Sequence, residues 1–509
     1  MTTPMVYSGD RAIPLADVRN RSSRLAAGLR ELGVAHGDRY AIVMRNEVEF
    51  LTASLAAAAI GAVPVPVNWH WTGEDLRHLL HDSGAKVIIA HSDLLESIER
   101  HKPQSATVLE AVPPPEVVEA YGLSDGGLSG RHRSVNELIE GNEPVTDVNT
   151  TPPLGVIYTS GTTGLAKGIQ RAAVSPDDAA MLAQGVTEMI ALRPEWRTIL
   201  PAPLYHSAPN FALLFAAQLG MDMHIMPRFD PEGFLRLIDE FKVDTVQMVP
   251  TMFRRLLALP EDVRASYDLS SLKAIVHAAA PCPPDLKKAM IDWVGPIVHE
   301  YYGGSEGGAW VMCDSAEALA HPGTVGRPMR DADIKILGPD GAEVPAGESG
   351  LIYGRPFTGW PDFTYIGNDE KRRSIEVDGY ITVGDIGHVD TDGYLYLSDR
   401  ANDMVIQGGV NVYPAEVEAS IFRIPGVSDV AVFGIPDVDL GEVLAAHLVI
   451  EDGAAITAES VREHVRSDLA KYKVPRVVVF EESLPREDSG KLFKRRLREK
   501  YWREAEASS

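Results

Sequence analysis

The chain has 509 residues, more than one hydrophobic core usually serves, so at least two packing units are expected. Its 48 Lys and Arg residues stand against 72 Asp and Glu residues, and the formal charge of −24 argues against nucleic acid and acidic membrane surfaces as partners. Two cysteines, Cys282 and Cys313, are too few for a disulfide framework and indicate a reducing, cytoplasmic compartment.

No membrane or export segment is expected. The first residues lack a basic stretch followed by an apolar one, which a secretory signal needs. The longest apolar tract, residues 51–67, is interrupted by Pro64 and Pro66. It therefore predicts a buried helix leading into a strand, and no integral membrane segment.

The middle of the chain alternates between short β-rich runs and amphipathic helical stretches, from about residue 39 to 310. Such alternation predicts helix-covered, mostly parallel sheets. One example is the helix expected over 230–242, with Asp230 as its N-cap. Residues from about 320 to 400 read as short strands and turns, and those beyond Arg400 as a compact α+β unit.

The predicted fold class is therefore α/β with two domains. A large N-terminal domain, residues 1–400, would contain the helix-covered sheets and a β-rich subdomain at about 320–400. A small α+β domain would comprise residues 401–509.

The segment from Tyr158 to Gly168 predicts a phosphate-binding loop. It follows an apolar run, 155–158, and combines hydroxyl donors, glycines and the positive charge of Lys167. The spacing does not fit the Walker pattern, in which Gly-Lys-Ser/Thr follows four residues after the first glycine. We therefore expect ATP bound by a different kind of loop; the alternative is a plain surface loop.

Further segments complement this loop. The run 301–306 follows an apolar strand, 296–299, so we expect it on a loop at the carboxyl edge of a sheet. There Tyr302 would stack on a purine, Ser305 would donate to a phosphate and Glu306 would hold Mg²⁺; the alternative is a simple turn. Asp385 and Arg400 would hydrogen-bond a ribose, although each also fits a turn cap or a solvated side chain.

In order and spacing, these segments resemble the adenylate-forming enzymes, the superfamily of acyl-CoA synthetases, adenylation domains and firefly luciferase. The resemblance covers nearly the whole chain. The matching segments are 158–168, 203–206, 302–306, 384–385, 399–403 running into 408–418, and 489–491.

The resemblance implies roles for individual residues. The ATP phosphates would be held by Thr159, Ser160, Gly161, Thr162, Thr163, Gly164 and Lys167. Adenine would be bordered by Ala279, Ala280, Pro281 and Tyr302, and the ribose held by Asp385 and Arg400. Ser305 and Glu306 would serve phosphate and Mg²⁺, and Lys491 would be the catalytic lysine of adenylation.

The resemblance also implies a second half-reaction with coenzyme A. The small domain would rotate about a hinge at Ala401–Asn402, withdrawing Lys491 and bringing Gly408 and Gly409 forward to line a pantetheine tunnel. Lys473 and Arg476 would lie near the CoA phosphates, with solvent-facing charges as the alternative.

The substrate is expected to be a small-molecule carboxylic acid. His206 would border and gate its site, and the pocket would draw on His206, Asn210, Phe211, Met248, Ala278 and Gly303. The resemblance favours an aromatic, phenylpropenoid-like acid, with fatty acids or cyclic and steroid-side-chain acids as alternatives. The acyl acceptor would be CoA, with an amine or a carrier protein as alternatives. A further alternative is a nucleotide-binding protein that catalyses no reaction. The joint presence of Lys167, Glu306 and Lys491 argues against it. A homodimer is compatible with this class.

Overall fold

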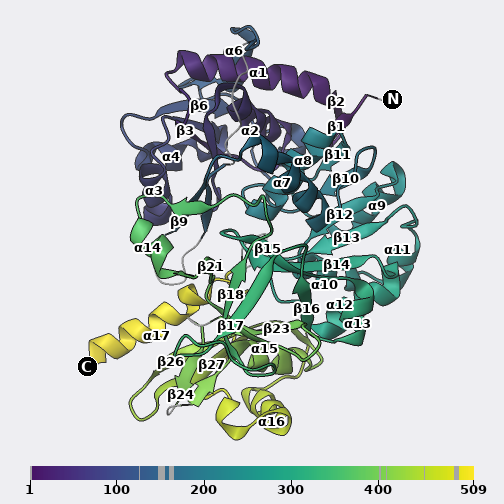
Figure 1. The fold of residues 1–509 in the computed structure, drawn as a ribbon, viewed down its shortest axis with the longest axis vertical. Coiled ribbons are helices and arrows are strands. Elements are labelled where there is room, and N and C mark those ends of the chain that lie inside the picture. The colour runs from purple at the N-terminus through teal and green to yellow at the C-terminus, as the bar shows by residue number, and fades with distance from the viewer. Residues whose placement is uncertain are drawn as a thin grey trace.

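The computed structural model describes residues 3–124, 127–146, 155–159, 166–400, 403–407, 410–451, 453–486 and 492–508. Within these ranges the strands form sheets of 15, five, three and five strands. In Figure 1 the N-terminal sheet lies at the top, the longest sheet runs through the middle and the C-terminal sheet lies at the bottom. The α/β class and the split into a large and a small unit are confirmed.

The N-terminal sheet has five parallel strands in the order β4-β3-β5-β6-β7. These strands are β3 (Arg39–Val43), β4 (Val63–Pro66), β5 (Val87–His91), β6 (Thr107–Ala111) and β7 (Arg133–Ser134). The helices between and before them are α1 (Leu15–Glu31), α2 (Val48–Ile60), α3 (Gly73–Asp82), η1 (Ser92–Leu94), α4 (Leu95–His101), α5 (Pro115–Tyr121) and α6 (Val135–Glu140). The apolar tract 51–67 accordingly forms most of α2 and then β4, as predicted.

The longest sheet begins with a parallel core in the order β11-β10-β12-β13-β14, edged by β1 and β2. Its strands are β1 (Met5–Ser8), β2 (Arg11–Pro14), β10 (Arg197–Leu200), β11 (Asp222–Ile225), β12 (Thr245–Met248), β13 (Ala274–His277) and β14 (Val298–Gly304). The helices of this region are α7 (Pro176–Met189), α8 (Ser207–Leu219), α9 (Pro231–Phe241), α10 (Pro250–Leu257), α11 (Glu261–Ala265), α12 (Pro284–Val294) and α13 (Ser315–Ala320). Helix α9 begins as predicted, because the Asp230 carboxylate accepts from the Gly233 amide at 2.6 Å.

The β-rich region continues this same sheet. Strand β15 (Gly308–Cys313) runs antiparallel to β14 and pairs with β16, which pairs with β23. The remaining elements are β16 (Thr324–Pro328), β17 (Asp333–Leu337), β18 (Gly350–Arg355), α14 (Asp369–Ser374), β20 (Glu376–Val377), β21 (Tyr380–Ile381), β22 (Asp385–Val389) and β23 (Leu395–Arg400). Residues 320–400 are thus rich in strands, as expected, but they extend the central sheet instead of forming a sheet of their own.

A small three-stranded sheet joins distant segments in the order β19-β9-β8. Strands β8 (Ile157–Thr159) and β9 (Lys167–Arg171) flank the predicted phosphate loop, and β19 (Phe363–Tyr365) comes from the β-rich region. The base of the phosphate loop is therefore paired with a segment that no local sequence pattern places beside it.

The C-terminal sheet has the order β25-β24-β27-β26, with β28 beside β27. Its elements are β24 (Val405–Gln407), β25 (Val410–Val412), α15 (Pro414–Phe422), β26 (Val427–Asp437), β27 (Gly441–Ile450), α16 (Ala458–Asp468), η2 (Lys471–Lys473), β28 (Val477–Phe480) and α17 (Lys494–Ser508). Helix α17, yellow in Figure 1, projects from this unit. The domain boundary at 400/401 stays a prediction, because residues 401 and 402 lie outside the described part of the chain.

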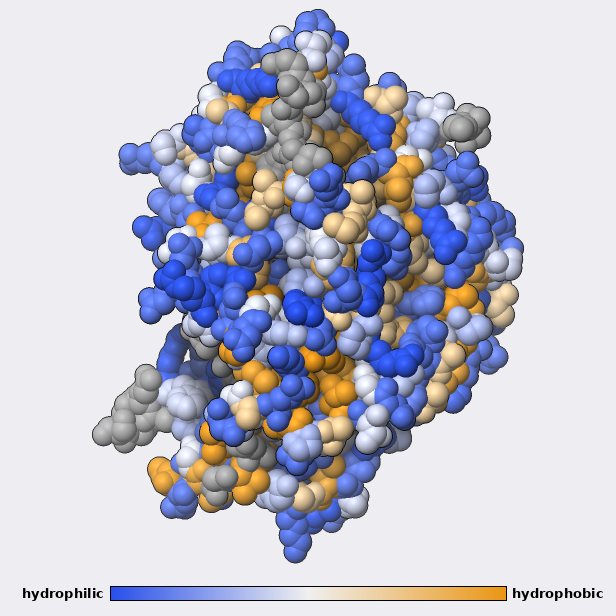
Figure 2. Space-filling view, viewed as in Figure 1, coloured by the Kyte–Doolittle hydropathy of each residue, from blue (hydrophilic) through white to orange (hydrophobic). Residues whose placement is uncertain are grey.

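The surface is mostly hydrophilic in the view of Figure 2, and apolar side chains gather toward the lower end, over the C-terminal unit. That unit exposes Ile406, Val410 and Tyr472 by 50%, 44% and 43%. Among the described helices, none has both the length and the apolar character that a membrane crossing requires.

A buried ion pair links three elements of the central sheet. The Lys287 ammonium, on α12, contacts the Glu300 carboxylate on β14 and donates to the Thr324 carbonyl of β16 at 3.2 Å. Only 6% and 5% of the two side chains are exposed. Both charged groups are removed from water, so each is stabilised mainly by the opposite charge of the other.

We expect Lys287→Met to lower the free energy of unfolding by about 3–5 kcal/mol, because it leaves the Glu300 carboxylate buried without its cation. The double variant Lys287→Met/Glu300→Leu should recover most of this loss. Urea denaturation of both variants measures the effect. A single variant as stable as the double variant would contradict this account.

Candidate active site

The predicted phosphate loop has a well-defined base. Strands β8 and β9 pair antiparallel, with Thr159 opposite Lys167. Gly168 is needed there, because a Cβ at this position would lie 2.7 Å from Cζ of Tyr158. The rest of the predicted loop lies outside the described residues, so its binding of phosphate stays a prediction; these residues are Ser160, Gly161, Thr162, Thr163 and Gly164.

The predicted metal residue lies on a hairpin turn. Strand β14 runs on through Gly304, and only residues 305–307 form the turn into β15. The expectation of a loop over 301–306 is therefore wrong for its first four residues. The reason is a close antiparallel pairing at a β-bulge: a Cβ on Gly303 would lie 1.8 Å from the Gly308 carbonyl oxygen. The glycines that suggested a loop instead allow two backbones to approach.

Lys167 and Glu306 meet at the ring of Tyr365. The Lys167 ammonium lies 5.7 Å from the Tyr365 ring centre, and the Tyr365 hydroxyl donates to Glu306 Oε1 at 3.0 Å. Burial, followed by repulsion from Lys371, lowers the pKa of Lys167, while the Glu306 carboxylate opposes that shift. Burial raises the pKa of Tyr365, so the phenol stays protonated and remains a donor. The structure thus brings together the predicted phosphate lysine and the predicted metal carboxylate.

Ser305 contacts the segment that was predicted to border the acid. Its hydroxyl lies 3.1 Å from that of Ser207, the first residue of α8. His206 is the N-cap residue of this helix, and its ring lies 4.5 Å from the ring of Tyr205. The serine expected at phosphate therefore contacts the helix start that carries the histidine expected at the acid.

The predicted ribose residues are neighbours in a strand pair. Asp385 opens β22 directly opposite Arg400, the last residue of β23. The Tyr302 hydroxyl donates to Asp385 Oδ2 at 2.8 Å, which joins the predicted adenine-stacking ring to the predicted ribose carboxylate. The Arg400 side chain lies outside the described atoms, so its contact with a ribose stays a prediction.

The predicted adenine border, Ala279 to Pro281, is separated from the end of β13 by Ala278 alone. Ala279 is exposed and has a φ of 73°, a backbone conformation that favours glycine. Ala280 does not share this conformation. The local strain lies on the side of the site where the nucleotide base is expected.

The candidate acid-pocket residues come from α8, β12, β14 and the residue that follows β13. Phe211 and Ala278 belong to one hydrophobic cluster, whereas Met248 is fully buried in another. The Asn210 amide donates to the Leu204 carbonyl at 3.0 Å, so it stabilises the start of α8. Gly303 lies in the close hairpin described above. Met248 lies opposite His277 in the β12–β13 pair, so its strand position adjoins Ala278, although the two side chains pack in different clusters.

Arg171, on β9, is a residue that the motif analysis missed. It is only 6% exposed and its guanidinium donates to the carbonyl oxygens of Ser305 and Glu306. The guanidinium also lies 5.5 Å from the Phe211 ring centre and 5.1 Å from that of Trp360. Burial lowers the pKa of Arg171 to about 10, so it stays charged at neutral pH.

The C-terminal candidates are placed in part. Lys473 pairs with Glu416, and Arg476 contacts Asp437. The Gln407 amide donates to the Tyr472 carbonyl at 3.1 Å, which sets the strand end before Gly408 beside the Lys473 segment. Gly408, Gly409 and Lys491 themselves lie outside the described residues.

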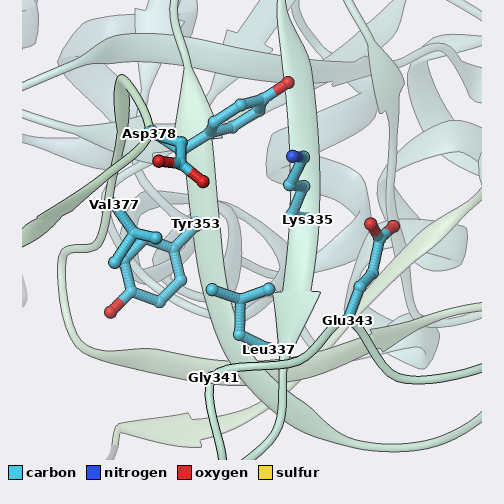
Figure 3. A pocket seen from close by; sticks show the side chains of 8 residues that line it. Lys335, Leu337, Gly341, Glu343, Tyr353, Val377 and Asp378 are labelled. Carbon is cyan, nitrogen blue, oxygen red and sulfur yellow. The ribbon is translucent and has the colours of Figure 1, made fainter.

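Other polar clusters and grooves lie apart from these residues. Within the described ranges, His321, Asp390 and Asp392 are the group whose ligand atoms come close enough to hold a metal ion. A groove of about 130 Å³ on the sheet of β17 and β18 is lined by Lys335, Glu343, Tyr353 and Asp378, among others (Figure 3). Neither includes a residue that the sequence motifs assigned to the site.

Known proteins are similar to this chain in sequence and in fold. A family profile described as AMP-binding enzyme matches residues 2–356, and one described as AMP-binding enzyme C-terminal domain matches residues 416–491. Long-chain-fatty-acid–CoA ligase FadD13 of Mycobacterium tuberculosis is 34% identical over 499 residues, covering 97% of this chain and 94% of that protein. Feruloyl-CoA synthase of Amycolatopsis sp is 33% identical over 500 residues, covering 97% and 95%.

A solved structure agrees with these matches. ATP-bound MatB from Rhodopseudomonas palustris superposes with a TM-score of 0.83 at 28% identity, over 98% of this chain and 96% of that one. The fold and the motif-bearing strands define an AMP-binding enzyme with a large and a small unit. The chain belongs to the adenylate-forming enzymes, in their AMP-forming acyl-CoA ligase branch, and the resemblance predicted from its motifs is confirmed.

The strain at Ala279 yields a stability test. Ala279→Gly should raise the free energy of unfolding by up to about 1 kcal/mol, because relief of the positive φ outweighs the extra freedom of the unfolded chain. Ala280→Gly is the matched control and should lower stability by about 0.4–1 kcal/mol. Urea denaturation checks both. Equal losses in the two variants would show that Ala279 carries no strain.

Proposed function

We propose that this protein is an ATP-dependent, AMP-forming carboxylic acid:CoA ligase. The observation that carries the proposal is the convergence of Lys167, Tyr365 and Glu306, which come from three separate strands or turns. A cation and a carboxylate that approach one another beside a hydroxyl-rich loop suit a nucleotide triphosphate and its metal ion. The family membership of the chain supports the same reaction.

The first half-reaction would form an acyl-adenylate. A carboxylate oxygen of the acid attacks the α-phosphorus of ATP, a new P–O bond forms, and pyrophosphate leaves with the electrons of the broken bond. Both partners are anions, so cations and oriented donors must lie where charge builds up. Lys167 and Lys491 would provide those charges.

Glu306 fits a magnesium ion, because its carboxylate is a hard oxygen ligand and Mg²⁺ binds through one or two carboxylates plus phosphate oxygens. Glu306 would hold the ion, and Ser305 would donate to a phosphate. When bound, Mg²⁺ would neutralise phosphate charge. The protein contributes the orientation of the carboxylate, which the Tyr365 hydroxyl already engages through Oε1.

The second half-reaction would transfer the acyl group to CoA. The thiol sulfur attacks the acyl carbonyl, AMP leaves, and the thiol proton is released. We propose that the C-terminal unit rotates for this step and that Gly408 and Gly409 line the pantetheine path. Lys473 and Arg476 would then exchange Glu416 and Asp437 for the CoA phosphates, which carry more charge.

The acid would be aromatic. Phe211, the predicted pocket residue, lies 5.8 Å from Trp360, which lies 5.7 Å from Phe357. All three rings are almost fully buried, and Arg171 lies near the faces of Phe211 and Trp360, so the rings would support the wall of a pocket for a flat acid. The similarity to feruloyl-CoA synthase favours this class, whereas the similarity to FadD13 keeps fatty acids as the second candidate.

A panel of acids tests the function. We expect pyrophosphate release from ATP with an aromatic acid in the absence of CoA, and thioester formation once CoA is added. Pyrophosphate release without any CoA-dependent thioester would move the acyl acceptor to an amine or a carrier protein. If no acid in a panel of aromatic, cyclic and fatty acids releases pyrophosphate, the proposed function fails.

Lys491→Ala separates the half-reactions. It should lower the rate of adenylation by at least about 100-fold, because the lysine charge is useful only while oxyanions develop on phosphate. A preformed acyl-adenylate should still react with CoA at a rate near that of the wild type. The two rates are measured by ATP–pyrophosphate exchange and by thioester formation from synthetic acyl-adenylate. Equal losses in both would contradict the assigned role.

A further inference from the structure

The turn that carries Ser305 and Glu306 is held from outside its own hairpin. Strand β19 pairs antiparallel with β9, which sets Tyr365 opposite Ile169 and Phe363 opposite Arg171. Directly opposed residues, and residues two apart on one strand, share a face of a sheet. Lys167, Arg171 and Tyr365 therefore lie on one face of this small sheet.

This face of the small sheet packs on the β14–β15 hairpin. Its apolar residues form one hydrophobic cluster with hairpin residues; the cluster includes Ile169, Phe363 and Tyr365 from the small sheet and Tyr302, Trp310 and Val311 from the hairpin.

Arg171 fixes the backbone of the turn. Its guanidinium donates to the Ser305 and Glu306 carbonyl oxygens, so one planar group holds two successive peptide units. The rings of Phe211 and Trp360 lie within 5.5 Å and 5.1 Å of the guanidinium carbon and hold the arginine in place. The turn continues into Gly307 and Gly308, and glycines leave a backbone free to move unless it is anchored.

Tyr365 fixes the side chain of Glu306. Its hydroxyl donates to Oε1 at 3.0 Å. The carboxylate is thus oriented through Oε1. Groups that orient a metal-binding carboxylate in this way typically raise metal affinity by about 10–100-fold.

We propose that Arg171 and Tyr365 are positioning residues that hold the Ser305–Glu306 turn in the geometry that Mg²⁺-ATP requires, Arg171 through the backbone and Tyr365 through the Glu306 carboxylate. The inference rests on the proposed function, because it takes Glu306 as the magnesium ligand. It adds two residues that the motifs do not contain. The β9–β19 pairing would then couple the phosphate loop mechanically to the metal-binding turn.

The hydroxyl of Tyr365 is tested by Tyr365→Phe. Tyr380→Phe is the matched control, because the Tyr380 hydroxyl also donates to a carboxylate, Asp333 Oδ2, at 2.6 Å, but in a part of the sheet that lacks the predicted site residues. The measurement is the rise in melting temperature that ATP produces, titrated with Mg²⁺. We expect the Mg²⁺ concentration at half-maximal effect to rise about 10-fold for Tyr365→Phe and to stay unchanged for Tyr380→Phe.

The paired hydrogen bonds from the Arg171 guanidinium to the turn are tested by comparing Arg171→Lys with Arg171→Met. Lysine keeps a positive charge but cannot donate to two carbonyls in one plane. If the turn must be held, both variants should raise the Mg²⁺ midpoint and the KM for ATP, with little change in the KM for the acid. Full recovery by lysine would mean that only the buried charge matters, and the assignment of Arg171 would be withdrawn.

Several outcomes separate this inference from the proposed function. If the wild type gains stability from Mg²⁺-ATP but turns over no acid, the ligase proposal fails, and the thermal measurement still decides the positioning roles. If Tyr365→Phe has the wild-type Mg²⁺ midpoint, Tyr365 does not position the metal carboxylate. If Mg²⁺-ATP does not stabilise the wild type at all, the inference falls together with the nucleotide site.

Discussion

The pairing of β9 with strands on both sides is the constraint on which the rest of the site depends. On one side β8 sets Thr159 opposite Lys167 at the base of the phosphate loop, and on the other β19 delivers Tyr365. Strand β9 is short, yet it carries Lys167 at one end and Arg171 at the other. Its position therefore decides where the loop lies relative to the Glu306 turn. Main-chain hydrogen bonds set this register, so it does not depend on any single polar side chain.

The electrostatics of the site follow from this arrangement. Two cations on one strand, Lys167 and Arg171, act on a single carboxylate, and burial lowers the pKa of each while Glu306 raises it. A triphosphate would add negative charge where the protein carries a cationic excess. The chain as a whole has a formal charge of −24, so this local excess of positive charge contrasts with its surroundings. A locally cationic site on an anionic protein favours a small anion over a polyanion such as nucleic acid, whose whole length meets the surrounding charge.

Which parts of the fold and of the candidate site could be predicted depends on how far apart in the sequence the contacting residues lie. The helix at 230–242, the buried helix and strand at 51–67, and the motif residues Lys167, Glu306 and Asp385 follow from local patterns. In the structure Tyr365 links Lys167 to Glu306, and Tyr302, on the strand that leads into the Glu306 turn, donates to Asp385. Tyr365 and Arg171 could not be found in this way. Tyr365 acts through a pairing with a strand almost two hundred residues earlier, and a lone arginine near the end of a strand predicts a solvated charge. The strand through Gly304 was missed because close backbone packing and a flexible loop both call for glycine.

The contacts between the two units bear on the proposed rotation. On the near side of the expected hinge, Asp399 of β23 accepts from the Ala415 amide, in the first turn of α15, at 2.9 Å. Arg254 of α10 lies 3.9 Å from the ring centre of Phe422 at the other end of the same helix. A hydrogen bond to a charged group contributes about 1.5–3 kcal/mol and a cation–π contact about 0.5–2 kcal/mol. A rotation about residues 401–402 would break both, so these two contacts favour the present orientation by a few kcal/mol. That is strong enough to favour one orientation and weak enough for a ligand with different affinities for the two orientations to reverse the preference.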